Sequence, residues 1–218
     1  MSAAPPRGGY LKQAWLVIVL ALVYGGGLAA VQTTLSGKIA ENKKAETYDV
    51  IPDLVPGGDK ARTEELLVQG ADGRDVRVYK VFAADGSHRG WVLPGAGQGF
   101  ADRIDLLVGL NADGSTITGL YVLAQKETPG LGDYITGEEF RRRFSGRPAG
   151  EPLVVVKSDP QADNEIRALS GATISSESVA AIVNAASANL MGAIGAEAQG
   201  RRDSPPVVQE SVQQTAPR

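Results

Sequence analysis

Ser170-Gly171-Ala172-Thr173-Ile174-Ser175-Ser176 is a turn of small residues that runs directly into an apolar, alanine-rich stretch. Gly171 and Ala172 have little side-chain bulk, so the backbone can bend closely around the Thr173 hydroxyl. A helix that starts here presents unpaired N–H groups and the positive end of its dipole at the same point. The segment therefore predicts a site for a phosphate group. Taken alone, it is equally compatible with a plain capping turn, in which the hydroxyls satisfy the first N–H groups of the helix.

The stretch after this turn predicts a helix over residues 176–195. Five apolar residues recur on one face of that helix and are expected to pack against a core: Val179, Ile182, Val183, Ala186 and Leu190. Upstream, short runs of β-branched and apolar residues alternate with turn residues. Two antiparallel hairpins are predicted, one from residues 75–84 and 89–93 around Asp85-Gly86, the other from residues 102–110 and 115–123 around a turn at 111–114.

The remaining patterns complete an α+β fold, an antiparallel sheet covered by a C-terminal helix. A short helix is expected over residues 137–144, and a Leu-Val-Val-Val run predicts a buried strand over 152–157. Residues 49–60 are rich in Pro and Gly and are read as a turn or linker. The expected organisation is an N-terminal segment 1–13, a transmembrane helix 14–35, a stalk and linker 36–62, a folded domain 63–195, and a disordered tail 196–218.

The N-terminal segment predicts a membrane anchor. Residues 14–34 carry no charge, and about 20 such residues span a bilayer as a helix. Trp15 and Tyr10 lie near its entering end, where aromatic side chains favour the membrane interface. The apolar character continues to Val31, beyond the small residues Gly27-Leu28-Ala29, which favours a retained anchor over a cleaved signal peptide. Basic residues occur on both sides, so their distribution does not determine the orientation.

Composition excludes several classes of function. The chain has 218 residues, 43% of them hydrophobic, and a net charge of -3, so it can build a core and has no bulk attraction to nucleic acid. It has no cysteine, which removes disulfides, thiolate metal sites and iron–sulfur clusters, and any redox chemistry must come from a cofactor. The only histidine, His88, is expected on an exposed hairpin without a metal role. Arg141-Arg142-Arg143 follows Glu138 and Glu139 at helical spacing, which predicts a solvated, salt-bridged face.

A second segment, Lys126-Glu127-Thr128-Pro129-Gly130-Leu131-Gly132, predicts a conformationally restricted loop. The proline fixes one dihedral angle, the glycines permit tight geometry, and Leu131 is held at the tip. Such a loop can lay backbone amides and one apolar side chain against a flat ring.

Both segments resemble those of the FMN-binding domain found in the G subunit of the Rnf electron-transport complexes and the C subunit of the Na+-translocating NADH:quinone reductase. The resemblance covers a membrane anchor, the Glu-Thr-Pro-Gly-Leu-Gly loop and the Ser-Gly-Ala-Thr segment in the same order, over most of residues 10–195. The Lys126-Glu127 lead-in and the compact length look more like the Rnf subunit.

The resemblance implies that Thr173 carries FMN covalently, through a phosphoester bond between its side-chain oxygen and the terminal phosphate of the flavin. Gly171 and Ala172 would let that phosphate approach, and Ser170 and Ser175 would donate hydrogen bonds to it. Four loop residues would lie along the ring or the ribityl chain: Glu127, Thr128, Gly130 and Leu131. A separate flavin transferase, with FAD as donor, would make the attachment.

The implied function is electron relay inside an ion-translocating ferredoxin:NAD oxidoreductase, with no independent turnover, catalytic residue or metal. The implied partners are the other membrane and peripheral Rnf subunits. The implied location is the cell inner (plasma) membrane, single-pass, with the FMN domain on the periplasmic or outer side. Three alternatives stay open: the quinone-reductase C subunit, a stand-alone redox domain that serves another reductase, and a tethered binding module whose turn only caps a helix.

Overall fold

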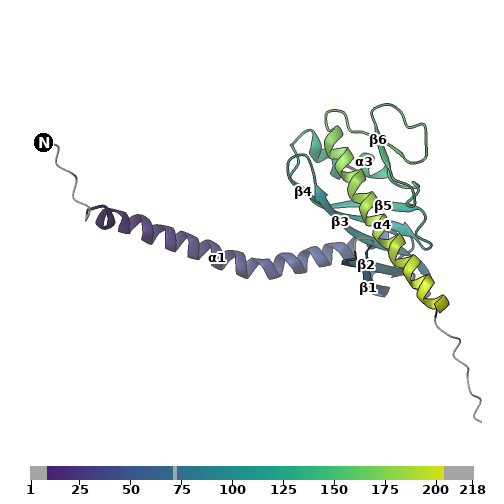
Figure 1. The fold of residues 1–218 in the computed structure, drawn as a ribbon, viewed down its shortest axis with the longest axis horizontal. Coiled ribbons are helices and arrows are strands. Elements are labelled where there is room, and N and C mark those ends of the chain that lie inside the picture. Colours follow the sequence, from purple (N-terminus) through teal and green to yellow (C-terminus); the bar gives the residue numbers. More distant parts are fainter. Residues whose placement is uncertain (1–8, 71–72, 204–218) are drawn as a thin grey trace, which may run out of the picture. The chain divides into compact units, whose positions relative to one another are not determined.

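The computed structural model describes residues 9–70 and 73–203 (Figure 1). The chain forms two compact units, one that ends at Glu46 and one that begins at Thr47. The first unit is helical, and the second holds the sheet and the remaining helices. The second unit has the predicted α+β fold.

Helix α1 (Gly9–Asp49) accounts for the first unit and continues into the start of the second. Its apolar side chains face outward, and Leu28, for example, is 76% exposed. Thr33 and Thr34 donate their hydroxyl protons to carbonyls one turn earlier, at Ala29 and Ala30, so these polar groups are satisfied within the helix. By length and composition α1 contains a stretch able to cross a membrane. The helix runs unbroken through the residues expected to form a stalk.

The main sheet is an antiparallel meander of five strands in chain order. These are β1 (Thr63–Gln69), β2 (Asp75–Phe82), β3 (His88–Gln98), β4 (Arg103–Asn111) and β5 (Ile117–Ala124). Both predicted hairpins are confirmed, with Val81 paired to Gly90 in the first and Val108 to Leu120 in the second. Strand β1 and the β3–β4 pairing were not predicted.

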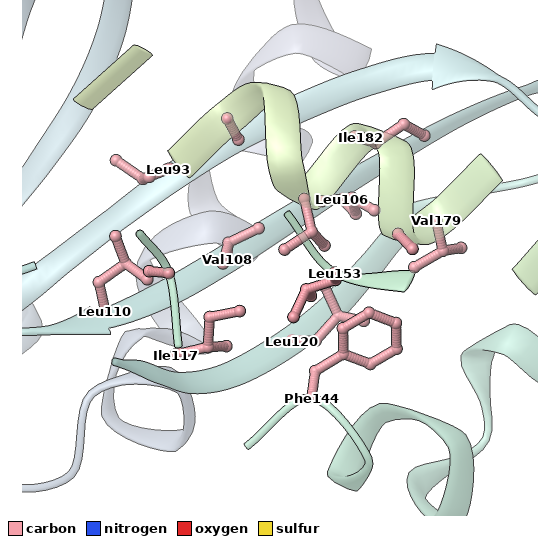
Figure 2. Packing of buried hydrophobic residues seen from close by; sticks show 14 of the residues in the cluster. Leu93, Leu106, Val108, Leu110, Ile117, Leu120, Phe144, Leu153, Val179 and Ile182 are labelled. Atoms are coloured by element: carbon pink, nitrogen blue, oxygen red, sulfur yellow. The ribbon is translucent and has the colours of Figure 1, made fainter. Parts of the chain in front are cut away.

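Helix α4 (Thr173–Asp203) covers one face of this sheet (Figure 1). All five predicted core residues of the helix are buried. Figure 2 shows Val179 and Ile182 from the helix in one cluster with Leu106 from the sheet and with Phe144. The helix begins three residues earlier than predicted and ends eight residues later. Residues 204–218 of the expected disordered tail lie outside the described residues.

A second, smaller core lies on the opposite face of the sheet, because neighbouring strand residues such as Leu106 and Leu107 point to opposite sides. It is covered by helix α2 (Ile51–Leu54). Its members are Val50, Ile51, Leu54, Val55, Tyr79, Val81, Val92 and Leu107. The prediction of a linker over residues 49–60 is therefore wrong. The Pro and Gly residues there do produce turns, but the apolar residues between them are buried against the sheet.

The other elements are short. They are the 3-10 helices η1 (Lys60–Arg62) and η2 (Gly132–Thr136), helix α3 (Glu138–Arg142), and the parallel pair β6 (Val154–Val156) and β7 (Glu165–Arg167). Helix α3 confirms the helix predicted over 137–144. The buried strand predicted over 152–157 is wrong in burial, because β6 pairs only with β7 and leaves Val154 50% exposed.

Two predicted surface features take definite form. Arg142 and Arg143 pair with Glu138 and Glu139 at helical spacing, as predicted, whereas Arg141 instead lies over the ring of Tyr121 at 5.2 Å. His88 lies at the predicted hairpin but is half-buried rather than exposed, because its ring packs edge-on against Trp91 at 5.0 Å between centroids.

Candidate functional site

The start of α4 has free hydrogen-bond donors. The Ala172 carbonyl accepts the first intrahelical bond, from the Ser176 N–H at 3.1 Å, which makes Ala172 the cap. The N–H groups of the next three residues, 173–175, therefore have no intrahelical partner. Across residues 9–70 and 73–203, neither the Ser170 nor the Thr173 hydroxyl makes a hydrogen bond. The plain capping turn considered above is thus not what these two hydroxyls form.

The turn before α4 brings the two sequence motifs together. Gly171 has φ +80°, a left-handed conformation that favours glycine. A Cβ at this position would lie 3.0 Å from the Leu131 Cδ2 atom, so the turn sits directly against the tip of the second loop. Within the turn, the Ser176 hydroxyl accepts from the Leu169 N–H and donates to the Ala172 carbonyl.

The second loop is a tight turn of its own. The Thr128 carbonyl accepts from the N–H groups of Leu131 and Asp133, at 3.2 and 3.3 Å. This fold leaves Leu131 46% exposed at the tip and leads into η2. An apolar side chain is therefore presented beside the free N–H groups of α4.

A cavity of about 300 Å³ lies between the two motifs. Its size is at the lower end of the range for ligand pockets, roughly 300–1,000 Å³. It is lined by Phe100, Thr128, Leu131, Gly132, Gly171, Ala172, Thr173, Ile174 and Ser175. None of these nine residues carries a charge, so an anion bound here would depend on backbone N–H groups and the helix dipole.

Phe100 lines the cavity but was not among the predicted site residues. It lies on the turn between β3 and β4 and is 60% exposed. The available signal was an aromatic residue set among turn residues, in Gly97-Gln98-Gly99-Phe100, where a solvent-facing loop has no structural need for one. Phe100, Leu131 and Ile174 give the cavity three apolar side chains from three separate segments.

Three of the expected site residues do not line the cavity: Glu127, Gly130 and Ser170. Glu127 lies behind it and is only 4% exposed. Its carboxylate accepts from the Ser175 hydroxyl at 2.6 Å and from the Ala101 N–H at 3.1 Å. Ser175 was expected to donate to a phosphate, but in this structure its single hydroxyl proton is directed to Glu127 instead.

The ion pair between Lys126 and Asp102 is not part of the cavity lining. The backbone N–H of Arg103, 2.7 Å away, holds the pKa of the Asp102 carboxyl below its usual value, and Lys126 acts in the same direction from 3.5 Å. Both side chains are at least half exposed, so their interaction is screened by water. The lining residues of the cavity therefore carry no formal charge, and the buried Glu127 carboxylate lies behind them.

A larger cavity of about 430 Å³ lies elsewhere, between α2, β5 and α3. It is lined mainly by polar and charged side chains, including Asp53, Glu138, Arg141 and Arg142. Neither of the two sequence motifs contributes to it. The cavity at α4 is therefore the one to which the sequence evidence points.

Comparison with known proteins gives one matching family model and relatives that include the following two. Residues 99–188 match the family model described as an FMN-binding domain. The chain is 32% identical over 184 residues to the G subunit of the Na(+)-translocating ferredoxin:NAD(+) oxidoreductase complex of Acetobacterium woodii, over 79% of this chain and 87% of that relative. It is 30% identical over 153 residues to the C subunit of the Na(+)-translocating NADH-quinone reductase of Neisseria meningitidis, over 66% of this chain and 54% of that relative.

One solved structure is similar in fold. It is the C subunit of the Na(+)-translocating NADH-quinone reductase of Parabacteroides distasonis, with a TM-score of 0.51 and 22% identity over 66% of this chain and 80% of that chain. At this identity the likeness concerns the fold alone. The matched FMN-binding segment, 99–188, contains all nine residues that line the cavity at α4.

Proposed function

Because the chain belongs to the family of G subunits of the ion-translocating ferredoxin:NAD(+) oxidoreductase (Rnf) complexes, we propose that it binds FMN in the cavity at α4 and relays electrons within such a complex. FMN supplies the electron-transfer chemistry when bound. The contribution of the chain is to hold the cofactor, orient it and keep it at the membrane.

The residues of the cavity fit the two parts of FMN. The free N–H groups of residues 173–175 and the positive end of the α4 dipole suit its phosphate. The apolar side chains of Phe100, Leu131 and Ile174 suit a flat aromatic ring. Ser170, at the outer side of the turn, has a hydroxyl available for the phosphate. Gly171 and Ala172 line the cavity and add little side-chain bulk to it.

The attachment is covalent and uses the Thr173 hydroxyl. In the balanced step, Thr173 Oγ1 attacks the flavin-side phosphorus of FAD, a new O–P ester bond forms, the phosphoanhydride bond breaks and AMP leaves. The hydroxyl proton passes to solvent or to a base of the flavin transferase that carries out the step. The support is that Thr173 lines the cavity at the first helical position with a hydroxyl engaged by no other described residue.

The chain works as one subunit among several and has no turnover of its own. Helix α1 anchors it in the inner membrane as a single span, with the FMN domain on the periplasmic or outer side. Its partners are the other subunits of the Rnf complex. Between the two related complexes, the Rnf assignment is favoured because the chain spans most of the G subunit but only about half of the quinone-reductase C subunit.

The proposal is tested by mass and fluorescence of the full chain. The chain is co-expressed with a flavin transferase, purified in detergent and examined by intact mass and by in-gel fluorescence after denaturation. The expected result is a mass increase of FMN less one water and a fluorescent band. Both are absent in Thr173→Ala and present in Thr128→Ala, which alters the other threonine that lines the cavity.

Two results would contradict the proposal. An adduct that persists in Thr173→Ala rejects the attachment point, while a wild-type chain of unmodified mass with no bound flavin favours the tethered binding module. Co-purification of the untagged neighbouring subunits from native membranes then distinguishes an Rnf complex from the quinone reductase and from a stand-alone redox domain.

A further inference from the structure

The Glu127 carboxylate joins three segments that are far apart in the sequence. One of its oxygens, Oε2, accepts from the Ser175 hydroxyl in the first turn of α4 at 2.6 Å. The other, Oε1, accepts from the Ala101 N–H in the β3–β4 turn at 3.1 Å. Glu127 itself belongs to the loop that presents Leu131. A single buried group thus connects all three walls of the cavity at α4.

The space around this carboxylate is closed by backbone. A Cβ added at Gly99 would lie 2.2 Å from Glu127 Oε1, and one added at Gly132 would lie 2.9 Å from Glu127 Oε2 and 2.8 Å from the Ser175 hydroxyl. Both glycines are therefore needed for the close approach. Glu127 is 4% exposed and Ser175 is 2% exposed, so water does not compete for these hydrogen bonds.

The hydrogen bond from Ser175 has a second effect. A serine hydroxyl has one proton, and here that proton is given to Glu127. Ser175 therefore fixes the helix start from behind and leaves the phosphate side of the turn to backbone N–H groups. Glu127 itself does not line the cavity and reaches it only through Ser175.

We propose that Glu127 is a positioning residue for cofactor attachment. It fixes the first turn of α4 against the Ala101 turn and the Leu131 loop, and so sets the Thr173 hydroxyl at the cavity. This role rests on the proposed function, because it concerns the attachment of FMN to Thr173. It differs from the role implied by the resemblance, in which Glu127 lies along the flavin.

The test compares three variants of the full chain, each co-expressed with the flavin transferase under conditions in which wild-type modification is incomplete. In Glu127→Ala the helix start loses its link, and we expect the initial rate of modification to fall about 10- to 100-fold, as for a misplaced reacting group. In Glu127→Gln the amide oxygen accepts from Ala101 and the amide nitrogen donates to Ser175, so we expect a rate within about twofold of the wild type.

The matched control is Asn184→Ala. Asn184 also links α4 to another segment, through hydrogen bonds to the Leu153 N–H at 2.8 Å and the Leu153 carbonyl at 3.0 Å. It lies 11 residues along the helix from Thr173, about 16 Å away. Its loss loosens α4 without touching the helix start, so modification is expected to stay within about twofold of the wild type.

Amide hydrogen exchange of the unmodified chain supplies a readout that needs no flavin. Backbone amides of residues 176–179 are expected to exchange about tenfold faster in Glu127→Ala than in the wild type or Asn184→Ala, because a hydrogen bond to a charged group is lost there. Unchanged exchange in Glu127→Ala overturns the inference, whatever the flavin content.

The inference is also overturned if Glu127→Ala is modified at the same rate as the wild type. It is overturned as well if Asn184→Ala or Glu127→Gln loses as much of the modification rate as Glu127→Ala does. A wild-type chain that takes up no flavin defeats the proposed function instead, while the exchange measurement still decides whether Glu127 holds the helix start.

Discussion

Leu54 tests whether α2 is part of the folded domain. Its side chain is 2% exposed and packs in the second core, and its carbonyl accepts a hydrogen bond from the Thr118 hydroxyl. Truncating a buried leucine to alanine costs about 2–5 kcal/mol. With a urea slope of about 2 kcal/mol per M, the unfolding midpoint of Leu54→Ala is expected to fall by about 1–2.5 M.

Leu67→Ala is the matched control, because Leu67 is 69% exposed on the edge strand β1. Its free energy of unfolding is expected to change by no more than about 0.5 kcal/mol. The assay is urea unfolding of a fragment of residues 47–203, followed by tryptophan fluorescence. Trp91 is the only tryptophan in that fragment and is 9% exposed, so its emission reports directly on the sheet.

A shorter fragment, 63–203, extends the same test. It lacks four buried side chains of the second core, Val50, Ile51, Leu54 and Val55. At about 1.5–3 kcal/mol each, their loss costs an upper estimate of about 6–12 kcal/mol, which is comparable with the whole stability of a domain, about 5–15 kcal/mol. We expect this fragment not to fold. Equal midpoints for Leu54→Ala and Leu67→Ala, or equal stability of the two fragments, would refute the reasoning.

Two further predictions concern the cavity and pH. Phe100→Ala is expected to keep the covalent flavin of the proposed function but to increase the quenching of its fluorescence by iodide, because one wall of the cavity is lost. The control is Tyr134→Ala, since Tyr134 is equally exposed but does not line the cavity, and it is expected to leave the quenching unchanged. Equal quenching in the two variants would contradict the role of Phe100. Burial, with Lys80 nearby, lowers the pKa of His88 against the opposing effect of the Gly90 carbonyl, so the unfolded state takes up the proton more readily. The contribution of neutral His88 to the free energy of unfolding is therefore fully present above about pH 6.5 and decreases as the pH falls below that value. In thermal melts from pH 7.5 to 5, the melting temperature should decline less in His88→Gln than in the wild type.

The sequence predicted the elements that local chemistry determines. Both hairpins were found because Asp85-Gly86 and Asp113-Gly114 end their turns with a glycine of positive φ, and each carboxylate accepts an N–H two residues on. The face of α4 was found because its apolar residues follow the helical period. These patterns depend only on residues that are close to one another in the sequence.

The missed features depend on contacts across the chain. Strand β1 lies at the edge of the sheet and contains the exposed residue Glu64. Its sequence, TEELLVQ, therefore shows no clear alternation of apolar and polar residues. The burial of α2 depends on a sheet face formed by strands that come later in the chain. The position of Glu127 follows from its meeting with Ser175, 48 residues away, and a loop motif by itself gives no sign of such a partner.

The division of the chain into two units separates the candidate membrane helix from the cavity at α4. Every residue that lines the cavity at α4, and both hydrogen-bond partners of the Glu127 carboxylate, belong to the unit that begins at Thr47. Thr173 stands at the end of a helix whose next turns are packed on the sheet through Val179 and Ile182 (Figure 2). The geometry around its hydroxyl is therefore set by the domain core. In the proposed function, α1 therefore sets where the flavin works, while the sheet and α4 set whether it can be attached.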